Sequence, residues 1–332
     1  MDDEAIHDAR NDNTMGCSMN IDHILLIGYG GPRCPDEVMP YIKLMTESKD
    51  VSHKALESIA SRYQEIGGAS PYHDQVLSFS RRLEKTLQDS DVHLAVFTGM
   101  KNWHPFLDET LRNIHQKRLR NGIAICLTAF PGAAAGAKYR EALDSAKTAL
   151  KLPDINYEFI AGWYDQRYFI EAQTELISEK LREIDSEKRQ TTPIIFSFHS
   201  LPLKSGRTAS GSNYAEEARV SSELIAKRLG HVKWSISYQS RPAKAKGEWM
   251  GPDITETLKA LAREGEKQVV IVPLGYFCEH VEILFDLDCH VRTIAEQLGM
   301  RYLRAEPILN HPKTIPLFKG LIEAQLGRHS NE

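Results

Sequence analysis

The sequence predicts an α/β fold of two doubly wound halves, each built on a parallel β-sheet that helices flank. Nearly continuous runs of apolar and β-branched residues recur along the chain, and such runs are typical of parallel strands buried on both faces. Long amphipathic segments separate them, as crossover helices do. The strand candidates form two groups, one ending near Trp163 and the other beginning near Thr192, which indicates two similar halves facing each other across a cleft.

The elements follow in order along the chain. The strand candidates are HILLIGYGG, HLAVFTGM, GIAICLTAF, NYEFIAGW, TPIIFSFHS, WSISYQS and QVVIVPLGY. Helices are expected over residues 80–88, 107–120, 139–150, 169–187, 214–229, 254–264 and 311–326. We therefore expect a disordered N-terminus over residues 1–20, a first domain over residues 21–165 and a second over residues 166–310. A C-terminal helix over residues 311–328 is expected to pack back on the first domain.

Composition excludes several classes of function. The chain has 332 residues, 42% of them hydrophobic, which is enough for two domains of ordinary size. Its net charge of −4, from 41 basic and 45 acidic residues, does not attract nucleic acid or an anionic membrane. No apolar run approaches the roughly 20 residues that span a bilayer, and the polar start does not resemble a signal peptide. A cytoplasmic protein without a membrane anchor is therefore expected.

The most informative segment is VVIVPLGYFCEHVEILFDLDCH, in which a strand leads into closely spaced acids and histidines. Glu279, Glu282, Asp286 and His290 are spaced by three, four and four residues, which predicts one stripe along a helix. Such a stripe can bind a divalent cation and relay protons, although a solvated acidic face is the alternative. The stripe begins at the carboxyl end of a strand, where ligands of α/β folds bind, and this favours a functional site.

Two other strand ends carry candidate functional residues. The strand in PIIFSFHSLP ends at His199, and Pro202 prevents it from continuing. An imidazole there, with the acidic stripe opposite, can form a base and metal site. The first strand ends in LLIGYGGP, which leaves Tyr29 at its tip as a core tyrosine or an oxygen ligand to a metal. This turn matches neither the dinucleotide-binding nor the phosphate-loop pattern.

Two loops offer groups that could contact a substrate. RYQEIGGASP supplies Arg62, Tyr63 and Ser70, and SYQSRPAKAKGEWMGP supplies Ser240 and Trp249. Guanidinium, phenol and hydroxyl donors suit carboxylates, whereas an indole suits a large flat apolar body. Ordinary loop chemistry is the alternative for either segment alone.

Six motifs in order resemble the ferrochelatase family, whose enzymes insert ferrous iron into a porphyrin. They are LLIGYGGP, RYQEIGGASP, the MKNWHP turn, FSFHSLP, SYQSR with WMGP, and VPLGYFCEHVEILFDLD. The resemblance runs from about His23 to about Asp288. It implies two Rossmann-like halves with four-stranded parallel sheets and a porphyrin in the cleft between them.

The resemblance also implies roles for particular residues. His199 and Glu282 match the catalytic pair, and the implied metal ligands are His199, Glu282, Asp286 and Tyr29. The implied porphyrin contacts are Tyr29, Arg62, Tyr63, Ser70, Lys101, Ser240 and Trp249. A tyrosine at position 29 is common in the branch that uses coproporphyrin III, so this substrate is favoured. Porphyrin and Fe²⁺ are the expected partners of a monomer that requires no cofactor and makes transient contact with neighbouring haem-pathway enzymes.

The chain departs from its family pattern in places. Thr46 and Glu47 occupy a region where relatives often have a propionate-binding arginine, Glu279 stands where aspartate is common, and residues 129–138 are rich in alanine and glycine. The five cysteines are scattered without a C-x-x-C pair, so no disulfide framework, zinc knuckle or [2Fe-2S] cluster is expected. Three alternatives stay open: a protoporphyrin IX ferrochelatase, a chelatase for another divalent metal, and a non-catalytic tetrapyrrole carrier.

Overall fold

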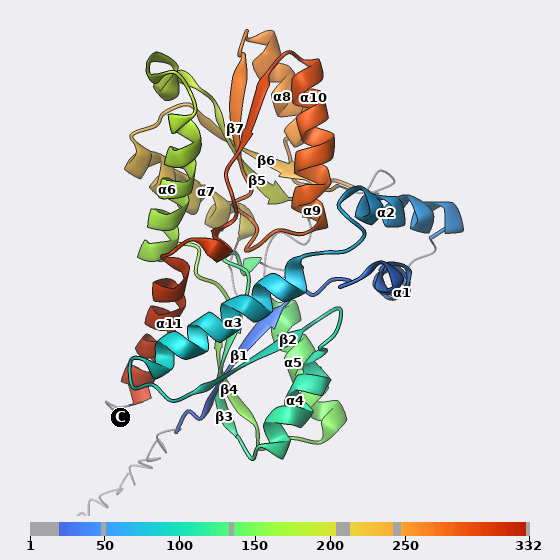
Figure 1. The fold of residues 1–332 in the computed structure, drawn as a ribbon, viewed down its shortest axis with the longest axis vertical. Helices are drawn as coiled ribbons and strands as arrows, with labels where there is room; N and C mark the ends of the chain where they lie inside the picture. The colour runs from blue at the N-terminus through green and yellow to red at the C-terminus, as the bar shows by residue number, and fades with distance from the viewer. Residues whose placement is uncertain (1–19, 48–50, 133–135, 204–212, 242–246, 330–332) are drawn as a thin grey trace, which may run out of the picture.

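Two four-stranded parallel sheets organise the chain, as a computed structural model of residues 20–47, 51–132, 136–203, 213–241 and 247–329 shows (Figure 1). The first sheet has the strand order β2-β1-β3-β4 and the second the order β6-β5-β7-β8. The predicted α/β architecture of two doubly wound halves is confirmed. The predicted disorder over residues 1–20 falls, except for Asn20, outside the described residues.

The first half carries β1 (His23–Gly28), β2 (Ala95–Met100), β3 (Asn121–Cys126) and β4 (Asn156–Ile160). Its helices are α1 (Pro35–Thr46), α2 (His53–Glu65), α3 (Tyr72–Gln88), α4 (Leu107–Gln116) and α5 (Ala137–Leu150). Every residue of β1 is buried, because this strand lies inside the sheet and helices cover both faces. The carboxyl end of β1 is therefore a fixed point from which Tyr29 emerges.

The second half carries β5 (Ile194–His199), β6 (Trp234–Gln239), β7 (Gln268–Val272) and β8 (Arg301–Arg304). Its helices are α6 (Arg167–Arg182), α7 (Tyr214–Leu229), α8 (Ile254–Arg263), α9 (Val281–Leu284), α10 (Arg292–Gln297) and the terminal α11 (Thr314–His329). A π-helix, Asp286–Val291, joins α9 to α10, and short 3₁₀ helices span Ser186–Thr191 and Ile308–Asn310. Within the described ranges, no helix has the length and apolar character that crossing a bilayer requires.

Several predicted bounds were wrong. Helix α3 begins at Tyr72 rather than at residue 80, and α6 ends at Arg182 before a separate 3₁₀ turn instead of continuing to residue 187. Helices α1 and α2 were not predicted, and α1 contains Pro40 in its interior. Strand β8 was missed because its sequence, RYLR, is short and half arginine.

One apolar core joins the two halves. It contains residues of both sheets, and its centre includes Phe79 from α3, Phe277 after β7 and Phe318 from α11, whose rings pack edge to face or tilted at 4.9–5.6 Å. Helix α11 packs against both α3 and α6 (Figure 1). The last helix thus ties the halves together, while the domain boundaries at residues 165 and 310 stay predictions.

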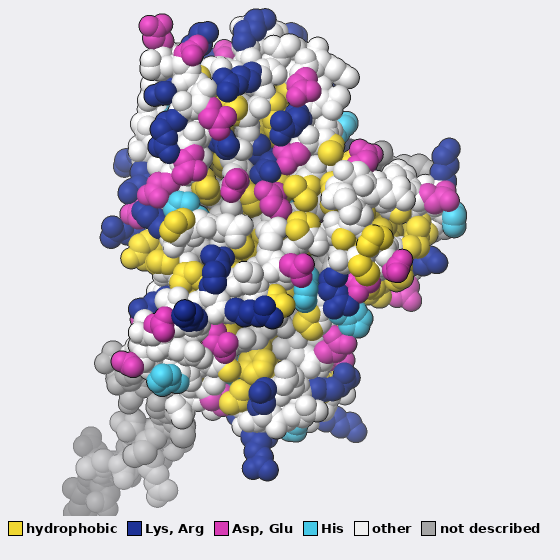
Figure 2. Space-filling view, in the orientation of Figure 1, with side chains coloured by type: hydrophobic (Ala, Val, Ile, Leu, Met, Phe, Trp, Pro, Cys, Tyr) yellow, Lys and Arg dark blue, Asp and Glu magenta, His cyan; other side chains and the backbone are white. Residues whose placement is uncertain are grey.

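Helices α1 and α2 project from the first half, and hydrophobic side chains gather on their exposed face (Figure 2). A separate apolar cluster beneath them includes Tyr41, Tyr63 and Trp103. The carboxylate of Glu37 on α1 accepts hydrogen bonds from the Arg33 backbone at 2.8 Å and from the Trp103 indole at 2.7 Å. It therefore fastens α1 to the loop that follows β2.

The Glu37 contacts predict a pH-dependent contribution to stability. The pKa of Glu37 is lowered from its usual 4.5 to about 2, and the main cause is the hydrogen bond that the Arg33 side chain donates. A carboxylate with a lowered pKa stabilises the fold above its unfolded pKa, and this contribution disappears as the pH falls from 4.5 towards 2. Glu37→Gln is expected to lower the free energy of unfolding by about 1 kcal/mol at pH 7. The value is small because solvent screens the charge of Arg33.

Urea unfolding of the native chain and of Glu37→Gln across this range measures the effect. The difference between their unfolding free energies should shrink between pH 4.5 and pH 2. A difference that stays constant with pH contradicts the role assigned to the carboxylate.

Candidate functional site

His199 and Glu282 face each other across the carboxyl end of the second sheet. Strand β5 is buried along its length and exposes only its last residue, His199, to partial solvent contact. Glu282 lies in the first turn of α9, and its Oε1 is 3.5 Å from Nε2 of His199. Both side chains are about one third exposed, at 34% and 32%, so a substrate can reach them.

The hydrogen bond on the other side of the imidazole sets its tautomer. Nδ1 of His199 lies 2.6 Å from the carbonyl oxygen of Ser200, which can only accept, so Nδ1 carries a proton. In the neutral imidazole, Nε2 then has a free lone pair directed at a carboxylate oxygen. Two acceptors facing each other are stabilised when a proton or a metal ion lies between them.

Gln239 anchors Glu282 to the sheet. It is the last residue of β6 and pairs with His199 in the parallel register. Its side-chain amide donates to the backbone carbonyl of Glu282 at 2.5 Å and accepts from the hydroxyl of Ser197 at 2.5 Å. The His199–Glu282 geometry is thus fixed by two neighbouring strands. Sequence reasoning missed Gln239, although its place just before Ser240 in the SYQS strand end was a usable signal.

Asp286 lies one helical turn beyond Glu282 and has a partner on each oxygen. Ser240 donates a hydrogen bond to Oδ2, and Nη1 of Arg62 lies 3.5 Å from Oδ1. Burial raises the pKa of Asp286, while the Ser240 hydrogen bond acts against that rise. Ser240 adopts φ 62°, a left-handed conformation unusual for a non-glycine residue, as found where a functional site fixes the backbone.

Two tyrosines from the first half approach this group. Tyr29 is 42% exposed, and the hydroxyl of Tyr72 accepts a hydrogen bond from its backbone N–H at 2.9 Å. The protein groups packed around the phenol partly desolvate it, which raises its pKa although the side chain stays partly exposed, and the negative charge of Glu282 raises it further. Tyr63 is buried, and burial followed by the Glu282 charge raises its pKa as well. Both phenols are therefore neutral hydrogen-bond donors near pH 7.

Three further predicted contacts lie outside the helices and named strands, each with partners nearby in its own half. Ser70 is buried, and its hydroxyl accepts a hydrogen bond from the Tyr72 backbone at 3.3 Å, so the loop itself uses it. Lys101 follows β2 and donates to the Asn102 side chain at 3.2 Å; burial lowers its pKa. Trp249 pairs with Pro202 in an antiparallel bridge, which puts it beside the segment that follows His199.

The predicted acidic stripe is not one helical face. Glu279 precedes α9 and forms an ion pair with Arg304 at 3.0 Å, while His290 is exposed in the π-helix, whose wider turn breaks the spacing of an α-helix. In the described part of the chain, no three His, Cys, Asp or Glu side chains lie close enough to hold a metal ion. The stripe prediction was wrong for Glu279 and His290, whereas Glu282 and Asp286 do share the site.

His280 is a site residue that the sequence reasoning missed. Its ring stacks on Tyr72 at 6.5 Å and meets the edge of Tyr276 at 4.9 Å, and its buried Nδ1 has no side-chain or backbone hydrogen-bond partner among the described residues. Burial lowers the pKa of His280. The available signal was its position between the two acids of the CEHVE segment.

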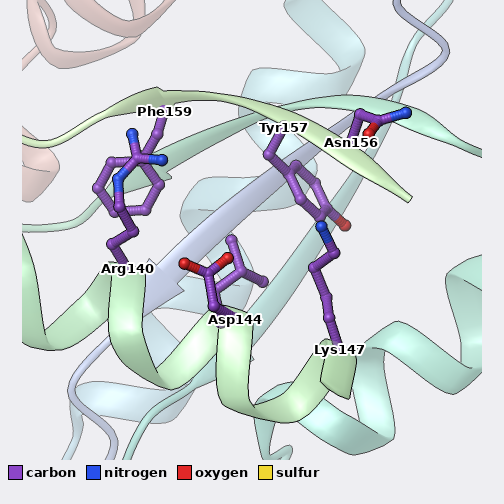
Figure 3. Close-up of a pocket in the computed structure, with 7 residues that line it drawn as sticks. Arg140, Asp144, Lys147, Asn156, Tyr157 and Phe159 are labelled. Carbon is purple, nitrogen blue, oxygen red and sulfur yellow. The ribbon is translucent and has the colours of Figure 1, made fainter. Parts of the chain in front are cut away.

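A pocket of about 400 Å³ lies elsewhere, between α5 and β4 (Figure 3). Arg140, Asp144 and Lys147 line it from the helix, and Tyr157 and Phe159 from the strand. The guanidinium of Arg140 covers the Phe159 ring at 4.4 Å. None of its lining residues belongs to the His199–Glu282 centre, so this pocket is separate from the candidate site.

A known protein family covers most of the chain. Residues 22–326 match the family model described as Ferrochelatase. The chain is 26% identical over 308 residues to the coproporphyrin III ferrochelatase of Mycolicibacterium smegmatis, covering 93% of this chain and 91% of that protein. It is 30% identical over 314 residues to the coproporphyrin III ferrochelatase of Frankia alni, covering 91% and 79%.

Among solved structures, the fold resembles SirB from Bacillus subtilis with Fe³⁺, with a TM-score of 0.53 and 11% identity, covering 92% of this chain and 95% of that one. It also resembles CbiX, the terminal enzyme of sirohaem biosynthesis in denitrifying bacteria, with a TM-score of 0.52 and 12% identity, covering 91% and 98%. At this identity the two likenesses support the fold alone. The match to the family model over residues 22–326 is the decisive one, and this chain belongs to the ferrochelatase family.

Proposed function

We propose that this protein inserts Fe²⁺ into coproporphyrin III during haem biosynthesis and releases two protons for each iron inserted. The observation that carries the proposal is the 3.5 Å apposition of His199 Nε2 and Glu282 Oε1 in a ferrochelatase-family chain. Relatives named coproporphyrin III ferrochelatases favour that porphyrin as the substrate.

The His199–Glu282 pair supplies the proton acceptors that the reaction needs. A free-base porphyrin carries two N–H protons, and both must leave the ring as iron enters. Nε2 of His199 has the free lone pair, because Nδ1–H is held by the Ser200 carbonyl. The Glu282 carboxylate then stabilises the imidazolium that forms and can take a proton itself. Asp286 offers the next acceptor along the same segment.

The same groups suit a metal that is a substrate. A resident structural metal has a closed shell of four protein ligands, whereas His199 and Glu282 provide one nitrogen and one oxygen with open positions. Iron held this weakly can first replace its bound water by these protein ligands. It can then replace the protein ligands by the porphyrin nitrogens. We propose that Asp286 and Tyr29 are further oxygen ligands that Fe²⁺ meets one after another before it enters the ring.

We propose that the porphyrin contacts come from both halves. Tyr29 and Tyr63 offer neutral donors from the first half, and Arg62 brings a guanidinium that suits a propionate. Lys101 and Ser240 are further candidates for carboxylates, and Trp249 for the flat face of the ring. The Ser70 hydroxyl already accepts a hydrogen bond within its loop and can still donate one to a propionate. Energy from binding the flat body and its propionates can offset the cost of bending the ring.

Replacing Tyr29 tests which porphyrin the site selects. Tyr29→Met removes a phenol that is 42% exposed and leaves the backbone bond to Tyr72 intact, so little change in melting temperature is expected. The ratio of insertion rates for coproporphyrin III over protoporphyrin IX should fall by up to about tenfold, the equivalent of one hydrogen bond. Unchanged kinetics with both porphyrins removes Tyr29 from the account.

An anaerobic assay with the purified protein tests the activity itself. Fe²⁺ and coproporphyrin III are mixed with a catalytic amount of protein, and porphyrin fluorescence and proton release are followed together. Repeated turnovers with two protons released per iron support the proposal. Loss of fluorescence that stops at one porphyrin per protein indicates a carrier, and faster insertion of Co²⁺ or Ni²⁺ than of Fe²⁺ indicates a chelatase for another metal.

We further propose that the protein works as a cytoplasmic monomer without a resident cofactor or iron–sulfur cluster. Its product then passes to the next haem-pathway enzyme through transient contact. Size-exclusion chromatography with light scattering tests the monomer, and metal analysis of the purified protein tests for a cluster.

A further inference from the structure

Arg62 connects the two halves at the catalytic centre. It lies near the end of α2 in the first half, and its guanidinium reaches the segment after α9 in the second half, where the two elements lie side by side (Figure 1). Nη1 is 3.5 Å from Oδ1 of Asp286, and the guanidinium carbon is 5.3 Å from the centre of the Phe285 ring. An aromatic face and a carboxylate therefore hold the arginine in place.

The two members of this ion pair differ in their access to solvent. Asp286 is 13% exposed, and its second oxygen accepts a hydrogen bond from Ser240, so both oxygens are occupied. Arg62 is 43% exposed, and its Nη1 is 3.5 Å from Asp286, beyond the usual length of a hydrogen bond. A carboxylate arriving from solvent can reach the guanidinium without first displacing Ser240 or Phe285.

Energetics favour such an exchange. A half-exposed ion pair at 3.5 Å with one contact typically contributes about 0–1 kcal/mol. A carboxylate that binds the guanidinium through two parallel N–H···O bonds makes a stronger and more directional contact. A substrate with several carboxylates can therefore take Arg62 from Asp286 at little cost.

We propose that Asp286 and a carboxylate of the porphyrin compete for Arg62, so that porphyrin binding frees Oδ1 of Asp286 beside Glu282. This inference rests on the proposed function and deepens it by making Arg62 a positioning residue that links substrate binding to the acidic segment. The freed oxygen becomes a ligand for the incoming Fe²⁺ only after the porphyrin has bound. Arg62 thereby sets an order of events within the site.

Binding of coproporphyrin III without iron tests the competition. Porphyrin fluorescence is titrated with the native chain and with Asp286→Asn, Arg62→Ala and the double variant. Asp286→Asn keeps an oxygen for Ser240 but removes the competing charge, so affinity should rise about two- to fivefold, as expected for loss of one half-exposed pair. Arg62→Ala should weaken binding, and adding Asp286→Asn to it should produce no gain.

Two controls separate competition from a general loss of negative charge. Asp288→Asn removes the same charge two residues further on, from a carboxylate that pairs with Arg304 at 2.7 Å, and should leave porphyrin affinity unchanged. The tetramethyl ester of coproporphyrin III, measured in the same detergent, should show no gain with Asp286→Asn. Asp286→Ala is a second variant that removes the competing oxygens if the asparagine does not fold.

The outcomes are distinct. No gain in affinity with either Asp286 variant, or a gain that persists without Arg62 or with the ester, overturns the exchange while leaving the proposed function in place. An equal gain with Asp288→Asn overturns it as well. If the native chain does not bind coproporphyrin III, the proposed function fails and the exchange fails with it.

Discussion

Replacing His199 by alanine or Glu282 by glutamine is expected to lower the rate of iron insertion by about 10²- to 10⁴-fold while porphyrin binding stays nearly unchanged. That range is the usual contribution of a positioned general base. Nε2 of His199 is the free lone pair at the end of β5, and Glu282 is the carboxylate 3.5 Å away. Without either partner, the porphyrin protons have no adjacent acceptor pair and iron loses a ligand.

Binding and turnover are measured separately on the same preparations. Fluorescence titration without iron gives the porphyrin affinity, and anaerobic insertion gives the rate. His290→Ala is the matched control, because His290 lies on the same segment but is exposed and away from the pair. Near-native turnover in either His199→Ala or Glu282→Gln contradicts the role assigned to that residue, and equal loss in His290→Ala contradicts the specificity of the site.

Gly122→Ala is expected to destabilise the first half by about 3 kcal/mol, at the upper end of the usual cost of overpacking a core. Gly122 lies in β3, where the sheet register pairs it with His23 on β1 and with Tyr157 on β4. A Cβ there would lie 2.6 Å from Nε2 of His23 and 2.6 Å from the Tyr157 ring. Because Gly122 has no side chain, His23 and Tyr157 can form a 2.9 Å hydrogen bond across β3.

A matched glycine controls for the effect of substitution itself. Gly320 lies inside α11 with open space around its Cβ position, so Gly320→Ala should stabilise the helix by about 0.5–1 kcal/mol. Thermal and urea unfolding of both variants measures the contrast. A melting temperature for Gly122→Ala equal to that of the native chain contradicts the packing described across β3.

The sheets could be predicted because their strands are almost wholly buried. Runs such as ILLIG and IIFSF have no polar residue on either face, apart from Ser197, and only parallel strands covered on both sides tolerate that pattern. Strand β8 carries two arginines in four residues and gives no such signal. Helix α1 contains a proline, which usually indicates that a helix has ended.

The proposed catalytic pair could be nominated from the sequence but its geometry could not. His199 stood out as the last residue of a strand and Glu282 because its segment follows one, and the sheet order brings those two strand ends together. The π-helix at Asp286–Val291 changed the spacing that the stripe prediction assumed, which separated His290 from the acids. Arg62 and Asp286 are more than 200 residues apart in the chain, so their contact depends on how the two halves pack. No local sequence pattern encodes that packing.

Anaerobic Fe²⁺ insertion into coproporphyrin III and protoporphyrin IX, measured side by side with the native chain, tests the proposed function. We expect repeated turnover with both protons released and a clear preference for coproporphyrin III. Preference for protoporphyrin IX would overturn the substrate assignment and the role of Tyr29, and absence of turnover with either porphyrin would overturn the proposed iron insertion itself.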